Sequence, residues 1–162
     1  MRWLLLICVA AFASCTTRPS ELKDFQSDGC SVFPDGTLNH PQKWQAHCVK
    51  HDLAYWQGGT REQRREADRE LVRSVRAEGH PVLARCMCFG MRIGGAPWWP
   101  TPWRWGFGWS YPRSYGVLSP DEQRQVNERC AAMKSDSSNS VISPPRSQIF
   151  SKFNYLTPPE TH

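Results

Sequence analysis

The stretch "HCVKHDLAYW", residues 47–56, sets a histidine directly before an aspartate in a pattern typical of an amphipathic helix. Residues three or four positions apart share one face of a helix. The face predicted to point inward carries Trp44, Cys48, His51 and Tyr55. Asp52 lies about a third of a turn from His51, so both side chains can serve one site from different directions. A His-Asp pair on its own is more often explained by packing and solvation.

Two helices are predicted around this stretch, over 41–56 and 61–78, with the short sequence "QGGT" between them. The second helix is well framed. Thr60 is its N-cap, Gln63 completes a capping box and Gly79 stops it. Because so short a connection returns the chain along the helix it has just left, the two helices are predicted to lie antiparallel.

Asp68 is the unusual residue of the second helix. It lies on an otherwise apolar stripe formed by Leu71, Val72 and Val75. An ionised carboxylate on an apolar face is costly unless it is paired. One candidate partner is Arg64 or Arg65, about one turn earlier on the same helix. The other is His51 on the antiparallel helix, and the sequence leaves this choice open.

The loop before the first helix, "SDGCSVFPDGTLNHP" (27–41), is rich in residues that oppose regular structure. Asp28 and the backbone carbonyls of its glycine-containing turn are the hard oxygen ligands that Ca²⁺ prefers. Asp52 would add a second carboxylate to such a site. The alternative is an Asx-turn that holds no ion.

Together these motifs carry a family resemblance. The sequence "DGC" (28–30), followed by "CVKHDLAY" (48–55) and by an aspartate on the next helix, resembles the phospholipase A2 superfamily. It is most similar to the short bacterial secreted branch, which has a Cys-x-x-His-Asp-x-x-Tyr helix. The resemblance covers about residues 26–93. The tyrosine- and glycine-rich calcium loop of the animal enzymes is missing, which fits the bacterial branch.

The resemblance implies a catalytic set and a reaction. His51 would be the general base, Asp68 the carboxylate that orients it, and Tyr55 a hydrogen-bond partner of Asp68. The implied reaction is the calcium-dependent hydrolysis of an acyl ester bond in glycerophospholipids by a water that His51 activates. No serine nucleophile is needed, and the chain has no G-x-S-x-G motif of the serine esterases.

The resemblance also implies a metal site and a disulfide. Ca²⁺ would be held by Asp28, the carbonyl of Gly29 and Asp52. Cys30 would bond to Cys48 and so attach the calcium loop to the histidine helix.

Residues 1–15 are predicted to be a bacterial signal peptide, with one basic residue, an apolar run too short to span a bilayer, and small residues at the end. Their last four residues are similar to a lipobox, so Cys15 is predicted to be acylated after cleavage. Ordinary cleavage nearby is the alternative. The predicted location is the bacterial envelope, anchored by lipid at the outer membrane, or the secreted fraction.

Export implies an oxidising compartment in which cysteines pair. Without Cys8 and Cys15, the remaining cysteines are Cys30, Cys48, Cys86, Cys88 and Cys130. Because their number is odd, one is free or pairs between molecules. A zinc site from Cys86 and Cys88 is not favoured, since one intervening residue is tighter than the usual ligand spacing.

Two further helices are predicted, over 81–93 and from Pro120 to about Met133. Ser119 caps the last of them, and Glu122 completes its capping box. The domain, residues 16–133, is therefore predicted to be mainly α. It would combine a disulfide-stapled antiparallel helix pair with a phospholipase A2-like core, a long Pro/Gly/Trp-rich loop and one C-terminal helix. The composition of residues 134–162 predicts a disordered tail.

The Trp-rich loop, residues 97–116, contains five tryptophans between prolines and glycines that exclude a helix. Trp and Tyr favour membrane interfaces, because an apolar ring carries a polar group. The residues predicted to contact a membrane or substrate are Trp98, Trp99, Trp103 and Arg104. Two alternatives are that the rings fold back over a small helical core, and that they stack on sugars.

The net charge of +5 favours anionic surfaces such as phospholipid head groups. Nucleic acid is not a predicted partner, because the arginines of residues 61–76 are interleaved with Glu and Asp. The predicted partner is a phospholipid membrane surface, and the sequence indicates no oligomeric state. The alternative function is a non-catalytic envelope lipoprotein that uses the same helical scaffold to bind lipid or a protein partner.

Overall fold

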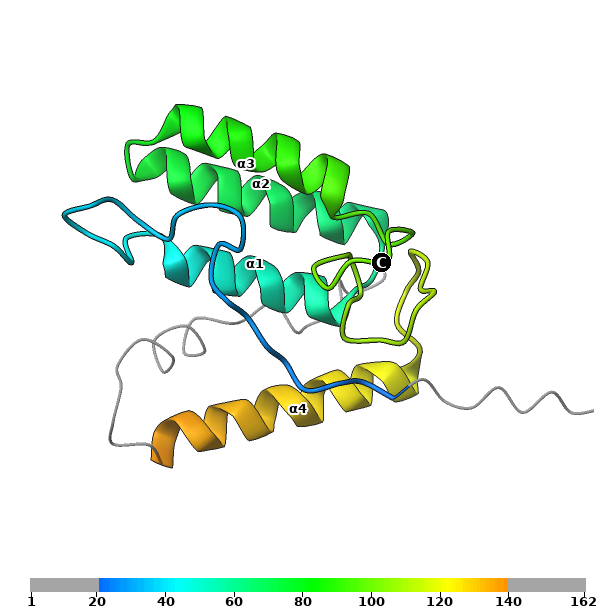
Figure 1. Ribbon diagram of the computed structural model, residues 1–162. Coiled ribbons are helices and arrows are strands. Elements are labelled where there is room, and N and C mark those ends of the chain that lie inside the picture. The colour runs from blue at the N-terminus through cyan, green and yellow to red at the C-terminus, as the bar shows by residue number, and fades with distance from the viewer. Residues whose placement is uncertain (1–20, 140–162) are drawn as a thin grey trace, which may run out of the picture.

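The computed structural model describes residues 21–139, which fold into helices without a strand (Figure 1). The helices are α1 (Gln45–Gln57), α2 (Arg61–Ala77), α3 (Pro81–Gly94) and α4 (Pro120–Asn139). The predicted mainly α fold is confirmed. The predicted signal peptide, Cys15 and residues 140–162 lie outside the described residues. Between residues 21 and 139, no helix is both long and apolar enough to cross a membrane.

Capping side chains fix where α2 and α4 begin. The Thr60 hydroxyl accepts a hydrogen bond from the Gln63 N–H at 3.2 Å, and the Gln63 side chain accepts one from the Thr60 N–H at 2.7 Å. Ser119 and Glu122 exchange the same two bonds before α4. Each box satisfies N–H groups that have no partner inside the helix, and both predicted boxes are confirmed. Beyond the end of α2, Gly79 adopts a φ of +88°, as a helix-stopping glycine does.

The first helix begins later than predicted, at Gln45 rather than residue 41. The preceding loop holds Trp44 on two sides. Its N–H donates to the Asp35 carbonyl at 3.0 Å, and its indole N–H donates to the Pro34 carbonyl at 2.6 Å. Residues 41–44 form turns instead, because these loop contacts fix the chain just before the helix.

The last helix continues past its predicted end at Met133 to Asn139, so residues 134–139 are helical rather than the start of a tail. These residues contain neither proline nor glycine, the residues that end helices most strongly. The Ser135 hydroxyl also donates to the Ala132 carbonyl at 2.8 Å, a bond that is compatible with helix.

α1 and α2 pack side by side and run antiparallel (Figure 1). Side-chain contacts across the pair establish the direction, because partners that come later in α1 come earlier in α2. These contacts join Lys50 to Glu70, His51 to Asp68 and Tyr55 to Arg64. α3 packs along the other side of α2, so that α2 lies between α1 and α3. The predicted antiparallel pair is confirmed.

Two apolar clusters hold these helices together. The first lies among α1, α2, α3 and the preceding loop, and it consists of Cys30, Trp44, Cys48, Leu71, Val75, Ala84 and Met87. The second joins α1 to α4 and the Trp-rich loop, and it consists of Leu22, Leu53, Trp56, Trp109, Val126 and Cys130. Each cluster therefore uses a different face of α1.

The cysteines divide into one disulfide and three thiols in the described residues. Cys30 and Cys48 are bonded, with their Cα atoms 5.0 Å apart, as predicted. Cys86, Cys88 and Cys130 are free thiols. The disulfide attaches the loop of residues 27–41 to the first turn of α1.

The turn between α1 and α2 packs directly against the Trp-rich loop. The Gly106 N–H donates to the Tyr55 carbonyl at 2.6 Å, and the Trp105 indole donates to the Gly59 carbonyl at 2.9 Å. A Cβ atom on Gly58 would lie 3.0 Å from the Cα of Gly106. The close approach of two backbones therefore requires glycine at this turn.

Candidate functional site

His51 and Asp68 meet in the seam between α1 and α2, where both are buried. The His51 Nε2 lies 3.0 Å from the Asp68 Oδ1. An ionised carboxylate can only accept hydrogen bonds, so Nε2 carries the proton of this bond. The other ring nitrogen, Nδ1, lies 3.8 Å from the Asp52 Oδ1. The two nitrogens therefore face different carboxylates.

The partner of Asp68, which the sequence left open, is His51 rather than an arginine one turn away. Arg65 is exposed. Arg64 is buried, but its Nε is 4.0 Å from the nearer Asp68 oxygen. The second close contact of Asp68 comes from Tyr55, whose hydroxyl donates to Oδ1 at 2.8 Å. Asp68 thus accepts two short hydrogen bonds from α1.

Arg64 has a different function, which the sequence did not reveal. Its guanidinium donates to the Tyr55 hydroxyl at 2.9 Å and to the Met91 carbonyl of α3 at 2.6 Å. It also donates to the hydroxyl of Tyr115 in the Trp-rich loop. Arg64 therefore links α1, α2, α3 and the loop behind the histidine. The available signal was its position one turn before Asp68 on the same buried stripe.

Opposing effects act on the pKa of His51. Burial disfavours the charged imidazolium and lowers the pKa, but the carboxylates of Asp52 and Asp68 outweigh burial and raise it above the ordinary 6.5. The same carboxylates therefore stabilise the ring when it accepts a proton. Burial, followed by the charge of Asp68, raises the pKa of Tyr55, so its hydroxyl remains a donor.

The predicted calcium ligands Asp28 and Asp52 line one cleft, whose volume is about 990 Å³. Local hydrogen bonds hold their carboxylates. Asp52 accepts from the Ser27 hydroxyl at 2.6 Å, and Asp28 accepts from the Ser31 hydroxyl at 2.8 Å. The third predicted ligand, the carbonyl of Gly29, belongs to the same turn, where Gly29 has a φ of +89°.

Asp35 fixes this loop, and sequence reasoning missed it. Its carboxylate accepts from the Cys30 N–H at 2.7 Å and from the Gln45 side chain at 3.0 Å. A Cβ atom on Gly29 would lie 2.4 Å from the Asp35 Oδ1, so only glycine fits there. The available signal was the "PDG" turn sequence within the loop.

The chemistry of the cleft suits a hard cation better than a soft one. From residue 21 to residue 139, no group of three or more His, Cys, Asp and Glu side chains is arranged to hold a metal ion. Asp28 and Asp52 offer two carboxylates, and the turn offers carbonyl oxygens. This donor set fits Ca²⁺, which takes oxygen ligands from carboxylates, carbonyls and water together.

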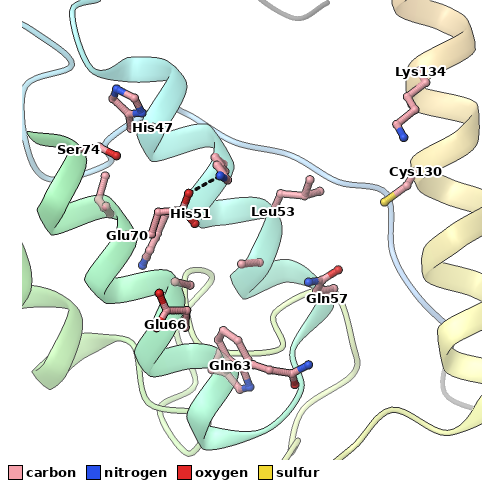
Figure 2. A pocket seen from close by; sticks show the side chains of 15 residues that line it. His47, His51, Leu53, Gln57, Gln63, Glu66, Glu70, Ser74, Cys130 and Lys134 are labelled. Carbon is pink, nitrogen blue, oxygen red and sulfur yellow. Dashed lines mark hydrogen bonds and ion pairs between the residues drawn. The ribbon is translucent and has the colours of Figure 1, made fainter. Parts of the chain in front are cut away.

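A second, smaller cavity of about 180 Å³ lies between the α1–α2 pair and α4 (Figure 2). His51, Leu53 and Leu71 are among its lining residues, with Cys130 and Lys134 on the α4 side. Asp52 is not part of this lining but faces the larger cleft. His51 and Asp52, although consecutive, therefore open onto different cavities.

The predicted lipid contacts divide into two groups. Trp98, Trp99 and Trp103 are exposed, whereas Trp105 and Trp109 of the same loop are buried. The last two rings cover the helical core, which was the alternative reading of the loop. The Trp-rich loop therefore contributes some of its rings to the core and exposes the others to solvent.

Arg104 was predicted to contact phospholipid, and this prediction is wrong. The side chain is 4% exposed, and its guanidinium donates to the carbonyls of Gly106 at 2.9 Å and Trp109 at 2.7 Å. Because the loop turns back on itself, its carbonyls converge on Arg104 and bury it. The arginine holds the loop together from inside.

Comparisons with known proteins return no match to this chain among protein-family models, curated proteins or solved structures. Function is therefore inferred from the site itself. The site combines a buried imidazole, the carboxylate of Asp68 on one ring nitrogen, and the carboxylate of Asp52 on the side of the other. Such an arrangement can accept a proton from a water molecule and stabilise the resulting charge.

Proposed function

We propose that the protein hydrolyses an acyl ester bond of glycerophospholipids in a calcium-dependent, phospholipase A2-like reaction. The observation that carries the proposal is the His51–Asp68 contact at 3.0 Å, with Tyr55 on the same carboxylate oxygen. A buried scaffold has no physical need for a histidine held in this way. The disulfide between Cys30 and Cys48 supports the proposed location in an oxidising envelope or outside the cell.

In this mechanism His51 acts as the general base through Nδ1. Because Nε2 donates to Asp68, the lone pair of Nδ1 is free to take a proton from an attacking water. Asp68 holds the ring in this tautomer and stabilises the imidazolium that forms. Tyr55 and Arg64 in turn hold Asp68 and each other in place.

Asp28, Asp52 and the carbonyl of Gly29 are the residues that would hold Ca²⁺. When bound, Ca²⁺ would polarise the ester carbonyl, stabilise the oxyanion and bind the substrate phosphate. The Asp52 Oδ1 lies 3.8 Å from the His51 Nδ1, so a cation held by Asp52 would lie close to the base, although the two side chains line different cavities.

The larger cleft is the space proposed for the substrate. Beside its carboxylates it is lined by apolar side chains that can receive an acyl chain, namely Leu22, Pro102, Trp103 and Phe107. The volume of the cleft, about 990 Å³, is far larger than a single bound cation would occupy. The head group of a phospholipid would therefore lie near the carboxylates, and its acyl chain would contact the apolar side chains.

The test measures fatty-acid release from mixed phospholipid vesicles by the purified protein, with Ca²⁺ or with EGTA, beside His51→Gln. Release that requires both Ca²⁺ and His51 would support the proposal. No release by folded protein that still binds the vesicles would refute it and favour the non-catalytic lipid-binding scaffold. Circular dichroism of both proteins supplies the control for folding.

A further inference from the structure

The outer side of α3 carries an exposed apolar stripe. Val82, Phe89 and Ile93 are 76%, 70% and 56% exposed. At about 100° per residue their spacing places all three on one side of the helix. The opposite side of α3 packs on α2 through Ala84 and Met87. The stripe is therefore additional to the face that the fold itself uses.

Three further exposed rings follow α3, in the Trp-rich loop. Trp98, Trp99 and Trp103 are 56%, 45% and 47% exposed. A Cβ atom on Gly94 would lie 3.4 Å from the Trp103 Nε1, so this indole lies against the last turn of α3. We call the combined surface the α3 face, and it consists of Val82, Phe89, Ile93, Trp98, Trp99 and Trp103.

The charge carried by α3 and the Trp-rich loop themselves has one sign. Residues 79–120 contain no Asp or Glu. Arg85 and Arg92 are exposed on α3 beside the apolar stripe, and their own helix offers no carboxylate to pair with. On α2, by contrast, Arg69 is paired with Glu66. The α3 face thus combines apolar side chains with positive charge.

The α3 face also borders the larger cleft. Trp103 belongs to both, because its side chain lines the cleft together with Asp28 and Asp52. On the loop that carries Asp28, the ring of Phe33 approaches Gly90 of α3. A surface that contacts Trp103 would therefore lie beside the cleft.

We propose that the α3 face docks on an anionic phospholipid bilayer, with the tryptophans at head-group level and Arg85 and Arg92 against the phosphates. Tryptophan favours this depth, and basic residues are attracted to anionic head groups. A second copy of the chain is the weaker candidate, because it would bring arginines together without carboxylates between them. The inference rests on the proposed function for its choice of lipid, and it adds the surface through which lipid is reached.

The test compares sedimentation of the full protein with two kinds of vesicle in EGTA, where calcium-dependent hydrolysis is stopped. One kind is phosphatidylcholine, and the other is phosphatidylcholine with phosphatidylglycerol. We expect tighter binding to the anionic vesicles. The double variant Phe89→Glu/Ile93→Glu should weaken it at least about tenfold, because two apolar side chains no longer enter the interface.

Two matched controls separate the α3 face from general effects. Leu38→Glu/Val117→Glu makes the same changes at two exposed apolar residues elsewhere, and it should bind within about twofold of wild type once general charge effects are allowed for. Arg85→Gln/Arg92→Gln should lose about fivefold per arginine, the fold-change for about 1 kcal/mol per basic residue at an anionic surface. Arg69→Gln/Arg73→Gln removes equal charge from α2 and should have less effect.

Equal losses from the α3 variants and their controls would overturn the docking proposal. So would a dimer in analytical ultracentrifugation that Phe89→Glu/Ile93→Glu converts to monomer without changing vesicle binding. Hydrolysis of a short-chain phospholipid dissolved as monomers reports on the active site alone. Monomer hydrolysis without vesicle binding would therefore refute docking only, and binding without hydrolysis would refute the proposed function only.

Discussion

The two nitrogens of His51 face regions built in different ways. On the Nε2 side, Asp68 lies at 3.0 Å, Tyr55 donates to the same carboxylate oxygen, and Arg64 donates to Tyr55. On the Nδ1 side, the nearest carboxylate oxygen belongs to Asp52 and is 3.8 Å away. Beyond Asp52 lies an open cleft. One side is therefore closed by protein groups. The other faces Asp52, which lines the larger cleft, whereas His51 itself lines the smaller cavity.

The difference follows from the elements that form each side. Helices α1 and α2 supply the closed side, because their antiparallel register determines which side chains meet. A loop supplies the open side, and its shape depends on Asp35 and on the disulfide between Cys30 and Cys48. A change on the closed side should therefore affect the chemistry of His51, whereas a change on the open side should affect the loop and the proposed Ca²⁺ site.

The largest effect is expected on the closed side, from Asp68→Asn. Turnover of phospholipid should fall at least about 10²-fold, because the amide no longer stabilises the imidazolium or selects the required tautomer. The measurement is the initial rate of fatty-acid release. Glu70→Gln on the same helix is the matched control and should retain most activity. Unfolding of Asp68→Asn would instead mean that the carboxylate is mainly structural.

The next effect is expected on the open side, from Cys30→Ser/Cys48→Ser. The free energy of unfolding should fall by about 2–4 kcal/mol, the usual contribution of a disulfide. Urea titration measures this change. Cys86→Ser removes an exposed thiol and serves as the control, with little expected loss. Two free thiols at positions 30 and 48 in peptide mapping of the native protein would contradict the stapled loop.

Asp52→Asn should separate calcium binding from folding. Affinity for Ca²⁺, measured by isothermal titration calorimetry, should fall at least about tenfold, because one of two carboxylates becomes a weaker neutral ligand. The melting temperature without Ca²⁺ should change little. Asp24→Asn, at another part of the same cleft, is the control. Unchanged affinity in Asp52→Asn would remove this residue from the proposed ligand set.

The smallest expected effect is on the pH dependence of the unfolding free energy. It involves both sides of His51, because Asp52 and Asp68 both raise the pKa of its ring. The folded-state pKa of His51 is raised by Asp52 and Asp68 despite burial, so its contribution to stability is fully present below the unfolded pKa of about 6.5. That contribution is lost as pH rises through the folded pKa. In EGTA, the difference in unfolding free energy between wild type and His51→Gln should therefore shrink from pH 6 toward alkaline pH. A difference that grows with pH would show the opposite shift.

The sequence predicted the closed side better than the open side, for a physical reason. Helical periodicity placed His51, Tyr55 and Asp68 on inward faces, and the capping box at Thr60 set where α2 begins. These signals are local, and an antiparallel pair then brings the faces together. Spacing therefore placed the histidine and the carboxylate on inward faces of neighbouring helices, but it left open whether Asp68 pairs with His51 or with an arginine of its own helix.

Contacts made by the non-helical segments could not be anticipated in this way. Arg64 reaches Tyr115 in the Trp-rich loop, and Asp35 reaches Gly29 across a turn. Arg104 looked like a surface cation, but the path of its loop buried it. Each of these outcomes depends on how a non-helical segment folds back on the protein. Such a segment has no regular spacing of apolar residues from which its path could be predicted. For the same reason, the sequence could not show that Trp105 and Trp109 are buried while the other tryptophans of the loop are exposed.

The glycine turn after α1 has a consequence for how this protein can vary. Gly58 and Gly106 approach so closely that a side chain on Gly58 would meet the backbone of Gly106, and Tyr55 and Gly59 bond to the same loop. A substitution in one of these two segments is therefore acceptable only if the other segment can accommodate it, although the two are far apart in sequence. Insertions at this turn should be rejected, although turns are usually the most permissive sites. In related chains, residues 58–59 and 105–106 should change together or not at all.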